Sequence, residues 1–417
     1  MTLDPVHVDG IARLATRVTE SVDETDHGDL VDRAWTEFLD PLYVDGDAVL
    51  EPLDGVRRHR VPIEDIALEP SPFDTQHGLD AGTINPTTFK NGLVLDVSQA
   101  AMAAVPSEVD LHRARTIVMT VHTNDPSVDV QDADWRLDDE GYARRRVLHA
   151  PRVDRYEQTV VHALALYLAE SVHAIDQAEV VDDLLVLDGP IYPTGLLRWS
   201  ERNPELRRLL TDEEQPRDVV ANYLHLVETF VEQDVPLVGF VKNSSSKALT
   251  RALRGKLGAP WVDDADFFRR VLERLDDDGD SKTDALTFTS WFRSRVGTDG
   301  MLAGDSPAVE CDRALDATAY EVTFFVIYDP RDDLVYRVEA PYAFTADPGL
   351  RADLTRHLLS EVAGERGPPL PVGKADELAR IDREGKRTLQ RRIEREFDTD
   401  RRQTYDDKRW NAVEELL

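Results

Sequence analysis

The spacing of apolar residues changes along the chain, and the change outlines the secondary structure. Apolar side chains recur every three or four positions over residues 156–178, which predicts a long helix with one buried face. The same spacing predicts further helices at 216–233, 246–256, 262–275 and 347–362. Short apolar runs bounded by Gly, Pro and Asn predict strands at 78–83, 92–97, 116–123, 183–189, 236–242, 319–328 and 334–340.

The order of these elements predicts the fold class. Strands first follow one another and then alternate with helices, which is typical of a mixed α/β sheet with helices on its faces. A helical hairpin is expected within 4–45, a loop-rich stretch at 52–76 and a proline-rich link at 367–373. The predicted division is an N-terminal helical and loop region (1–75), a core with a helical insertion (76–345, insertion 245–300) and a C-terminal helical region (346–417).

The chain is strongly acidic, and the balance among its basic residues is unusual. Its 417 residues include 81 Asp and Glu against 49 Lys and Arg, of which 8 are Lys, giving a formal net charge of −32. Such a surface repels itself unless salt screens it, and the Debye length falls to about 3 Å at 1 M salt. We interpret the composition as adaptation to a salt-rich cytoplasm, with an acidic mesophilic protein as the alternative. In a salt-adapted protein, acidity is only weak evidence against a nucleic-acid partner.

Other features of the sequence restrict the cellular setting. No stretch approaches the roughly 18 uncharged apolar residues that a membrane span needs. The start, MTLDPVHVDG, lacks the basic and apolar regions of a signal peptide. Cys311 is the only cysteine, which excludes a disulfide or a cysteine-rich zinc site within one chain. We expect a cytoplasmic protein without a membrane partner.

Two predicted strands end in an aspartate followed closely by glycine. Asp80 lies in Leu79-Asp80-Ala81-Gly82, and Asp188 follows the apolar run 184–187 and precedes Gly189. A carboxylate at the end of a buried strand needs a positive partner, and the small residue beside it lets a ligand approach the backbone. Side by side, the two strands would form a divalent-metal site with oxygen ligands. The alternative is that each aspartate opens a turn or caps a helix.

The helix before the second strand could supply a third carboxylate. The strand covers about 17 Å, and returning that distance takes about 11 helical residues. With a short connection, the position level with Asp188 falls near 168–172, where Glu170 lies. Glu157 is the rival, but the same arithmetic leaves it more than about 10 Å too far along. An ordinary solvated glutamate is the alternative for either residue.

Five short segments, in this order, resemble the NurA nucleases of archaea. They are Leu79-Asp80-Ala81-Gly82-Thr83, Leu187-Asp188-Gly189-Pro190-Ile191-Tyr192, Val238-Gly239-Phe240-Val241-Lys242-Asn243-Ser244, Tyr336-Arg337-Val338-Glu339-Ala340-Pro341, and Pro369-Leu370-Pro371 with Ala375 and Leu378-Ala379-Arg380-Ile381. Each segment is weak alone, but together they span about three quarters of the chain, and their order is specific.

The resemblance implies a fold, an activity and partners. It implies an RNase H-like nuclease core that holds Mn2+ or Mg2+ and cleaves single-stranded DNA, resecting duplex ends 5′ to 3′ in recombinational repair. It also implies a homodimer that works with a HerA-type hexameric ATPase. By motif, Asp80 and Asp188 would be catalytic metal ligands, with Glu170 as the helix carboxylate between them. Lys242 would contact a phosphate or orient the nucleophile, with a surface lysine as the alternative.

Two positions depart from the family pattern. Many members carry a histidine after the late alanine, and a tyrosine before the preceding Pro-Leu segment. Here Asp376 follows Ala375, and the earlier segment reads Arg366-Gly367-Pro368-Pro369-Leu370. Either Asp376 supplies an oxygen ligand in place of the imidazole, which is our hypothesis, or the site has one ligand fewer. The departures also keep a second interpretation open, a catalytically weak nuclease-fold subunit that clamps DNA or regulates its ATPase partner.

Local groups of arginine could bind DNA despite the overall acidity. The candidates are Arg144, Arg145 and Arg146 in one run and Arg57 and Arg58 in another. Cationic side chains supply most of the affinity for a phosphate backbone. Pairing with neighbouring acidic side chains is the simpler interpretation of any single cluster.

Overall fold

The structure is a computed structural model, and it describes residues 5–19, 25–125, 134–151, 158–202, 204–243, 246–303 and 309–402. The strands are β1 (Leu42–Val44), β2 (Asp47–Pro52), β3 (Arg58–Pro62), β4 (Gln76–Thr88), β5 (Val94–Val105), β6 (Arg115–His122), β7 (Arg136–Asp138), β8 (Ala143–His149), β9 (Leu185–Asp188), β10 (Leu237–Val241), β11 (Ala285–Thr289), β12 (Phe292–Ser294), β13 (Val322–Asp329) and β14 (Leu334–Pro341). The α-helices are α1 (Pro5–Thr19), α2 (Thr25–Glu37), α3 (Ile63–Ile66), α4 (Val109–Arg113), α5 (Gln158–Asp176), α6 (Thr194–Leu197), α7 (Trp199–Arg202), α8 (Pro204–Asp212), α9 (Glu214–Glu232), α10 (Ala248–Leu257), α11 (Asp264–Leu272), α12 (Tyr342–Thr345), α13 (Pro348–Glu365), α14 (Leu370–Ala379) and α15 (Arg383–Glu396).

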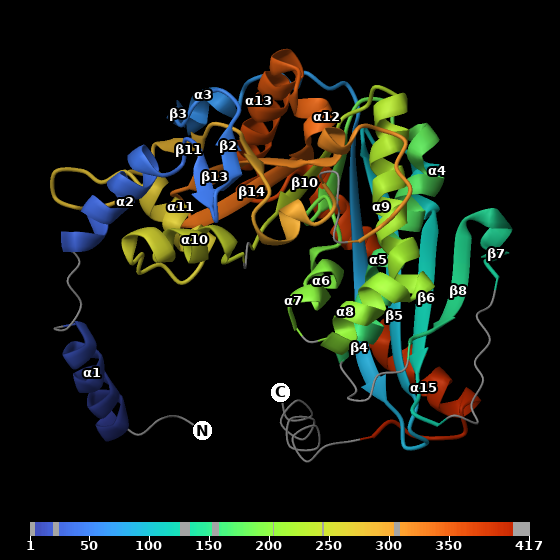
Figure 1. Ribbon diagram of the computed structural model, residues 1–417. Helices are drawn as coiled ribbons and strands as arrows, with labels where there is room; N and C mark the ends of the chain where they lie inside the picture. Colours follow the sequence, from blue (N-terminus) through green and yellow to red (C-terminus); the bar gives the residue numbers. More distant parts are fainter. Residues whose placement is uncertain are drawn as a thin grey trace.

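All fourteen strands of the described residues belong to one mixed sheet. Its order is β1-β2-β12-β13-β14-β10-β9-β4-β5-β6-β8-β7, with β11 and β3 branching from β13 (Figure 1). The pairs β4–β9, β9–β10 and β6–β8 are parallel, and the remaining pairs are antiparallel. The predicted mixed α/β sheet with flanking helices is confirmed, and the predicted strands at 319–328 and 334–340 correspond to β13 and β14, which pair antiparallel.

Helices cover both faces of the sheet because the central strands are apolar on both sides. Leu185 and Leu187 of β9 belong to the core that α5 and α9 cover, whereas Val186 packs on the opposite face with α13. A third core joins α2, α10 and α11 to β12–β14, and a fourth joins α15 to β4–β6. Burial on both sides explains why β9 and β10 are continuous apolar runs without alternation. No helix of the described residues is long and apolar enough to cross a membrane.

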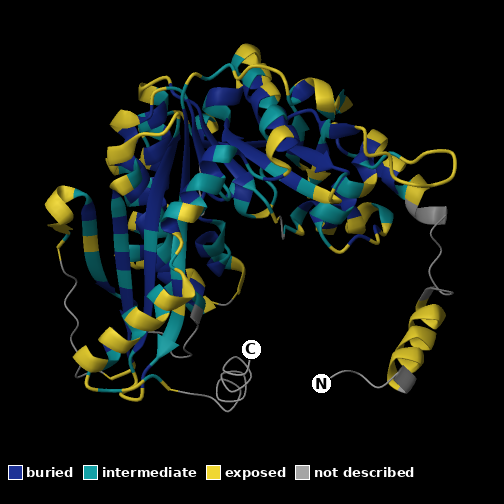
Figure 2. Cartoon of the chain, turned by 180° about the vertical axis from the view of Figure 1, so that it is seen from behind, coloured by how far each residue is buried: buried dark blue, intermediate teal, exposed yellow. Residues whose placement is uncertain are grey.

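Three expectations about the connecting segments are wrong. The stretch at 52–76 contains β3 and α3, and the proline-rich link contains the start of α14, since proline is well tolerated in a first helical turn. The N-terminal helices form but make no packed hairpin, because the apolar side chains of α1 remain exposed (Figure 2). The predicted division at 75/76 and 345/346 stays a prediction, although β1–β3 share the sheet with the later strands.

Candidate metal centre

The two aspartates lie next to each other, although only Asp188 ends its strand; the expectation that Asp80 ends a strand is wrong, because β4 continues to Thr88. β4 and β9 are parallel neighbours, and their register pairs Leu79 with Leu187. Asp80 and Asp188 occupy the next position on each strand, and the charge of Asp188 acts on the Asp80 carboxyl group. The adjacency expected from the sequence therefore exists at the end of β9.

Glu170 reaches the same place from α5. Its side chain lines a cavity of about 110 Å³ together with Asp188, Tyr167 and Tyr223. The Tyr223 hydroxyl donates a hydrogen bond to Glu170 Oε2 at 2.9 Å. Glu170 therefore lies level with Asp188, as expected from the helical rise. The rival, Glu157, lies outside the described residues.

Burial holds these carboxyl groups close to neutrality. Burial, reinforced by Asp80 and Asp188, raises the pKa of Glu170 to about 8, and the Tyr223 hydrogen bond opposes this only in part. Burial and the neighbouring Asp188 raise the pKa of Asp80 to about 7. Burial also raises the pKa of Asp188, against the lowering effect of Lys242. When carboxyl groups lie this close together, the negative charge of one disfavours ionisation of the next unless a cation lies between them.

Lys242 and Asp376 complete the cluster. Lys242 follows β10, and its Nζ lies 2.6 Å from Asp188 Oδ2 in a half-buried ion pair. Asp376 comes from α14, and its charge raises the pKa of both Asp80 and Asp188. Its side chain is half exposed and lies 3.9 Å from Arg380. Asp80, Asp188 and Lys242 therefore lie together at the end of β9, and Glu170 and Asp376 lie near enough for their charges to interact with the two aspartates.

Two glycines place α14, and with it Asp376, against β4. A Cβ on Gly78 would stand 2.2 Å from the Pro371 carbonyl carbon, and one on Gly82 would stand 2.2 Å from the Ala379 oxygen. Both glycines lie two residues from Asp80, on the same face of the strand. The expectation that the small residue after Asp80 admits a ligand is wrong for Gly82, because Gly82, like Gly78, admits the backbone of α14 instead.

A buried ion pair fixes the loop that follows Asp188. Arg337 Nε lies 2.8 Å from Glu339 Oε1, and Glu339 Oε2 accepts a hydrogen bond from the Ile191 amide at 3.2 Å. Asp299 lies 2.7 Å from the second side of the same guanidinium. Sequence reasoning used the Tyr336–Pro341 segment for the resemblance and missed this positioning role. An arginine and a glutamate two apart in an otherwise apolar strand were the available signal.

Tyr223 was also missed. It lies on the buried face of α9, where a phenolic hydroxyl needs a hydrogen-bond partner. A tyrosine in the apolar stripe of a helix predicts such a partner, but the sequence does not say which one.

The carboxylate oxygens of the cluster are the type of ligand that a divalent cation prefers, although they are not arranged to coordinate a cation. Within the described residues, no three Asp, Glu, His or Cys side chains stand in a metal-holding arrangement. Two of the carboxyl groups are engaged by other side chains, Asp188 by Lys242 and Glu170 by Tyr223. Oxygen donors gathered at one point, with burial opposing their charge, are the chemistry that Mn2+ and Mg2+ prefer.

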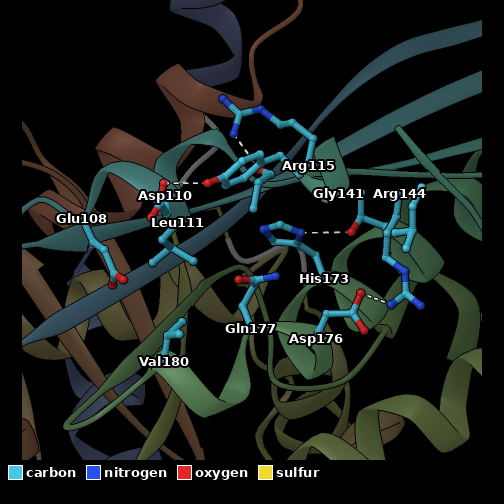
Figure 3. A pocket seen from close by; sticks show the side chains of 14 residues that line it. Glu108, Asp110, Leu111, Arg115, Gly141, Arg144, His173, Asp176, Gln177 and Val180 are labelled. Atoms are coloured by element: carbon cyan, nitrogen blue, oxygen red, sulfur yellow. Dashed lines mark hydrogen bonds and ion pairs between the residues drawn. The ribbon is translucent and has the colours of Figure 1, made fainter. Parts of the chain in front are cut away.

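The arginine runs lie elsewhere, and most of them are engaged. Arg144 is paired with Asp176 at the wall of a separate cavity of about 380 Å³ (Figure 3). Arg145 lies 3.3 Å from Asp138, and Arg146 lies over the Trp135 ring. Arg58 is 2.7 Å from Asp32. Arg57 alone among these five has neither an ion pair nor a ring contact with a described residue.

Comparison with known proteins identifies the family. The sequence profile described as the NurA domain matches residues 74–381, well over half of the chain. The chain belongs to the NurA family. The matched region contains Asp80, Glu170, Asp188, Lys242 and Asp376. Among curated proteins, no sequence matches the chain.

Several solved NurA structures are similar to the chain at low sequence identity. The NurA nuclease from Sulfolobus solfataricus is 11% identical, covers 95% of this chain and 98% of its own, and gives a TM-score of 0.49. NurA bound to dAMP and manganese is 11% identical, covers 94% and 97%, and gives a TM-score of 0.44. NurA with manganese is 10% identical, covers 79% and 94%, and gives a TM-score of 0.37.

Proposed function

We propose that this chain is a divalent-metal-dependent nuclease that cleaves single-stranded DNA. The observation that supports the proposal is the grouping of Asp80, Glu170, Asp188 and Asp376 around the end of the central strand β9, with Lys242 beside them. A cluster of buried carboxyl groups costs stability. Its presence therefore points to a function that needs these groups. Within the NurA family, that function is nucleic-acid hydrolysis.

Manganese or magnesium is the proposed cofactor, held by Asp80, Glu170 and Asp188, with Asp376 as a fourth oxygen donor. When bound, the metal supplies charge neutralisation at the scissile phosphate and lowers the pKa of an attacking water. The protein's contribution is to fix the donors on rigid elements. Asp80 and Asp188 lie on paired strands, Glu170 is anchored by Tyr223, and the loop after Asp188 is held by Glu339.

Lys242 has two roles in this proposal. Without metal its ammonium group neutralises Asp188, which keeps the carboxylates together. Once Asp188 engages a cation, the same ammonium group is free to contact a nonbridging oxygen of the phosphate. A lysine is suited to this change because its single charge sits on a flexible stem.

Family membership supports the wider biological setting. We propose that the chain acts on DNA ends in recombinational repair, resecting them 5′ to 3′ as a homodimer with a HerA-type hexameric translocase. We also propose a cytoplasmic location and an archaeal, salt-adapted source, the latter from the acidity of the chain.

Cleavage of a labelled oligonucleotide tests the proposal directly. End-labelled single-stranded DNA is incubated with the purified protein and Mn2+ over a range of KCl concentrations, and products are resolved by length. Wild type should cleave, while Asp188→Asn should lose at least about a hundredfold in rate, since it removes a charge needed in the transition state. Absence of cleavage by wild type, or equal cleavage by the variant, would overturn the proposal.

The Lys242–Asp188 ion pair favours a second candidate, a weak nuclease-fold subunit that clamps DNA. In that case the lysine replaces the cation permanently. Isothermal titration with Mn2+ separates the two functions, because a clamp should bind DNA equally well with and without metal and should show no stoichiometric metal uptake.

A further inference from the structure

A basic groove lies apart from the carboxylate cluster, along β3, β11 and α13. It encloses about 520 Å³ and includes four arginines among its lining residues, namely Arg57, Arg60, Arg351 and Arg356. Asp54 is the single acidic residue of the lining. In a chain with 81 acidic and 49 basic residues, this local excess of positive charge is notable because it opposes the overall balance.

Two of the four arginines are available to a ligand. Arg351 is buried and paired with Asp54, and Arg356 lies 2.8 Å from Asp353. Arg57 and Arg60 are exposed, and neither has an ion-pair partner among the described residues. The Arg57 backbone is nevertheless fixed, since its amide and carbonyl both bond to Ser290 at 3.1 and 3.0 Å.

The groove also contains a flat aromatic surface. His59 stacks on Phe288 with ring centroids 5.2 Å apart and an interplanar angle of 23°. Phe288 covers one face of the imidazole, and the His59 side chain is otherwise exposed. Burial against the strand and the charge of Arg57 lower the pKa of His59, so the ring is neutral at neutral pH. A neutral ring with an open face is a surface on which a base can stack.

The groove and the aspartates share one side of the sheet. Phe288 and Val61 pack into the same core as Val186 and Phe240, and Asp188 follows Val186 by two residues. From β9 the order runs through β10, β14, β13 and β11 to β3. These are five spacings of about 4.8 Å, or about 24 Å across the sheet. At 3.4 Å per nucleotide, that distance corresponds to about seven stacked nucleotides.

We propose that this groove binds single-stranded DNA, with phosphates against Arg57 and Arg60 and a base stacked on His59. The proposal rests on the proposed nuclease function and extends it, because the groove would hold the strand about seven nucleotides from the carboxylates. Unpaired cations together with an aromatic face are the recognition elements of single-stranded nucleic acid. A protein partner of acidic sequence would use the cations but not the stacking ring.

Binding measured without metal tests the groove separately from catalysis. Fluorescence anisotropy with labelled (dT)20 in EDTA gives Kd as a function of KCl for wild type and for Arg57→Gln/Arg60→Gln. The variant should lower the slope of log Kd against log salt by about 1.4, which is about 0.7 for each lost phosphate contact on a single strand. Arg391→Gln/Arg392→Gln removes two exposed charges from α15 and should leave the slope unchanged.

The stacking surface has its own test. His59→Ala should weaken binding of (dT)20 about tenfold, as expected for one stacked base, but should not change binding of an abasic 20-mer. All substituted residues are exposed, and thermal melting should show unchanged stability. Equal affinities and slopes for the groove variants and wild type would overturn the proposal and leave β3 as an edge strand whose charges only prevent pairing between molecules.

Cleavage assays keep the two proposals distinguishable. A pentanucleotide is too short to reach from the carboxylates to the groove, so its Mn2+-dependent cleavage should be unaffected in Arg57→Gln/Arg60→Gln. Cleavage of a 20-mer should fall at subsaturating DNA. If wild type cleaves neither substrate, the nuclease function fails, whereas equal 20-mer cleavage by wild type and variant overturns the groove alone.

Discussion

The sharpest consequence of the carboxylate cluster concerns Glu170 without metal. Its folded-state pKa is raised to about 8 from an ordinary value of 4.5. An acid whose folded pKa is raised favours the folded state while it stays protonated, so stability is lost as pH rises from the unfolded pKa through the folded one. Metal-free wild type should therefore be less stable at pH 8.5 than at pH 5.5 on account of this side chain.

The magnitude follows from the two pKa values. Between pH 5.5 and 8.5 the ionisation penalty of Glu170 grows by about 3 kcal/mol. Glu170→Gln removes the titration while its amide oxygen can still accept the Tyr223 hydrogen bond. At about 2.1 cal/mol/K per residue, the unfolding entropy of the whole chain is about 0.9 kcal/mol/K, so the variant should gain about 3 to 4 °C in Tm relative to wild type over this range.

The assay is thermal melting of both proteins in EDTA at pH 5.5 and 8.5 with constant high KCl. Only the difference between the two proteins matters, because all other titrating groups are common to both. Adding Mn2+ at pH 8.5 should raise the Tm of wild type more than that of the variant, since bound ligand stabilises the folded state. Parallel pH profiles for the two proteins would refute the assignment of Glu170 as a buried, proton-holding carboxyl group.

Three further substitutions test the supports of the site. Gly82→Val should destabilise the protein by about 1 to 3 kcal/mol and lower activity, because its Cβ would stand 2.2 Å from the Ala379 oxygen; chemical denaturation measures the loss, and unchanged stability would contradict the close approach of α14. Glu339→Gln should cost about 3 to 5 kcal/mol by leaving Arg337 with a neutral partner in a buried network, and melting with and without Mn2+ checks it; a loss below 1 kcal/mol would argue against the network. Asp376→Ala should raise the Mn2+ concentration for half-maximal cleavage about tenfold, as for loss of one oxygen ligand; an unchanged titration would remove Asp376 from the site.

Much of the sheet could be predicted because its apolar runs are short and well bounded. Seven strands were not predicted, namely β1, β2, β3, β7, β8, β11 and β12. The second half of β5 was also missed, because the run Ala100-Ala101-Met102-Ala103-Ala104 has the composition of a helix. These residues are fully buried or nearly so, and they let α5 and α14 approach the sheet from opposite faces. Tertiary packing overrides local propensity here, and no local signal announces it.

The site could be predicted to the extent that backbone geometry determines it. Helical rise placed Glu170 level with Asp188, and the prediction that Asp80 and Asp188 lie on neighbouring strands was right, although Asp80 lies inside its strand. The roles of Glu339 and the two glycines beside Asp80 could not be predicted, because they depend on which distant segment packs against each residue. The sequence also could not reveal that Lys242 pairs with Asp188, since a lysine at a strand end has several partners in an acidic chain.

The effect of the net charge of −32 on DNA binding depends more on how far the charges lie from the DNA than on their negative sign. In concentrated salt, charges farther apart than the Debye length of about 3 Å barely interact, so the diffuse acidic surface repels DNA little. The same screening removes long-range attraction, and only groups in contact with the strand contribute. Arginine–phosphate contacts weaken as the salt concentration rises, because the release of counterions then contributes less to binding. Base stacking does not depend on counterion release. On the proposal that the chain is a salt-adapted nuclease, it should owe more of its affinity at high salt to His59 on Phe288 than to Arg57 and Arg60, and the ratio of the two variant effects should reverse as KCl is lowered.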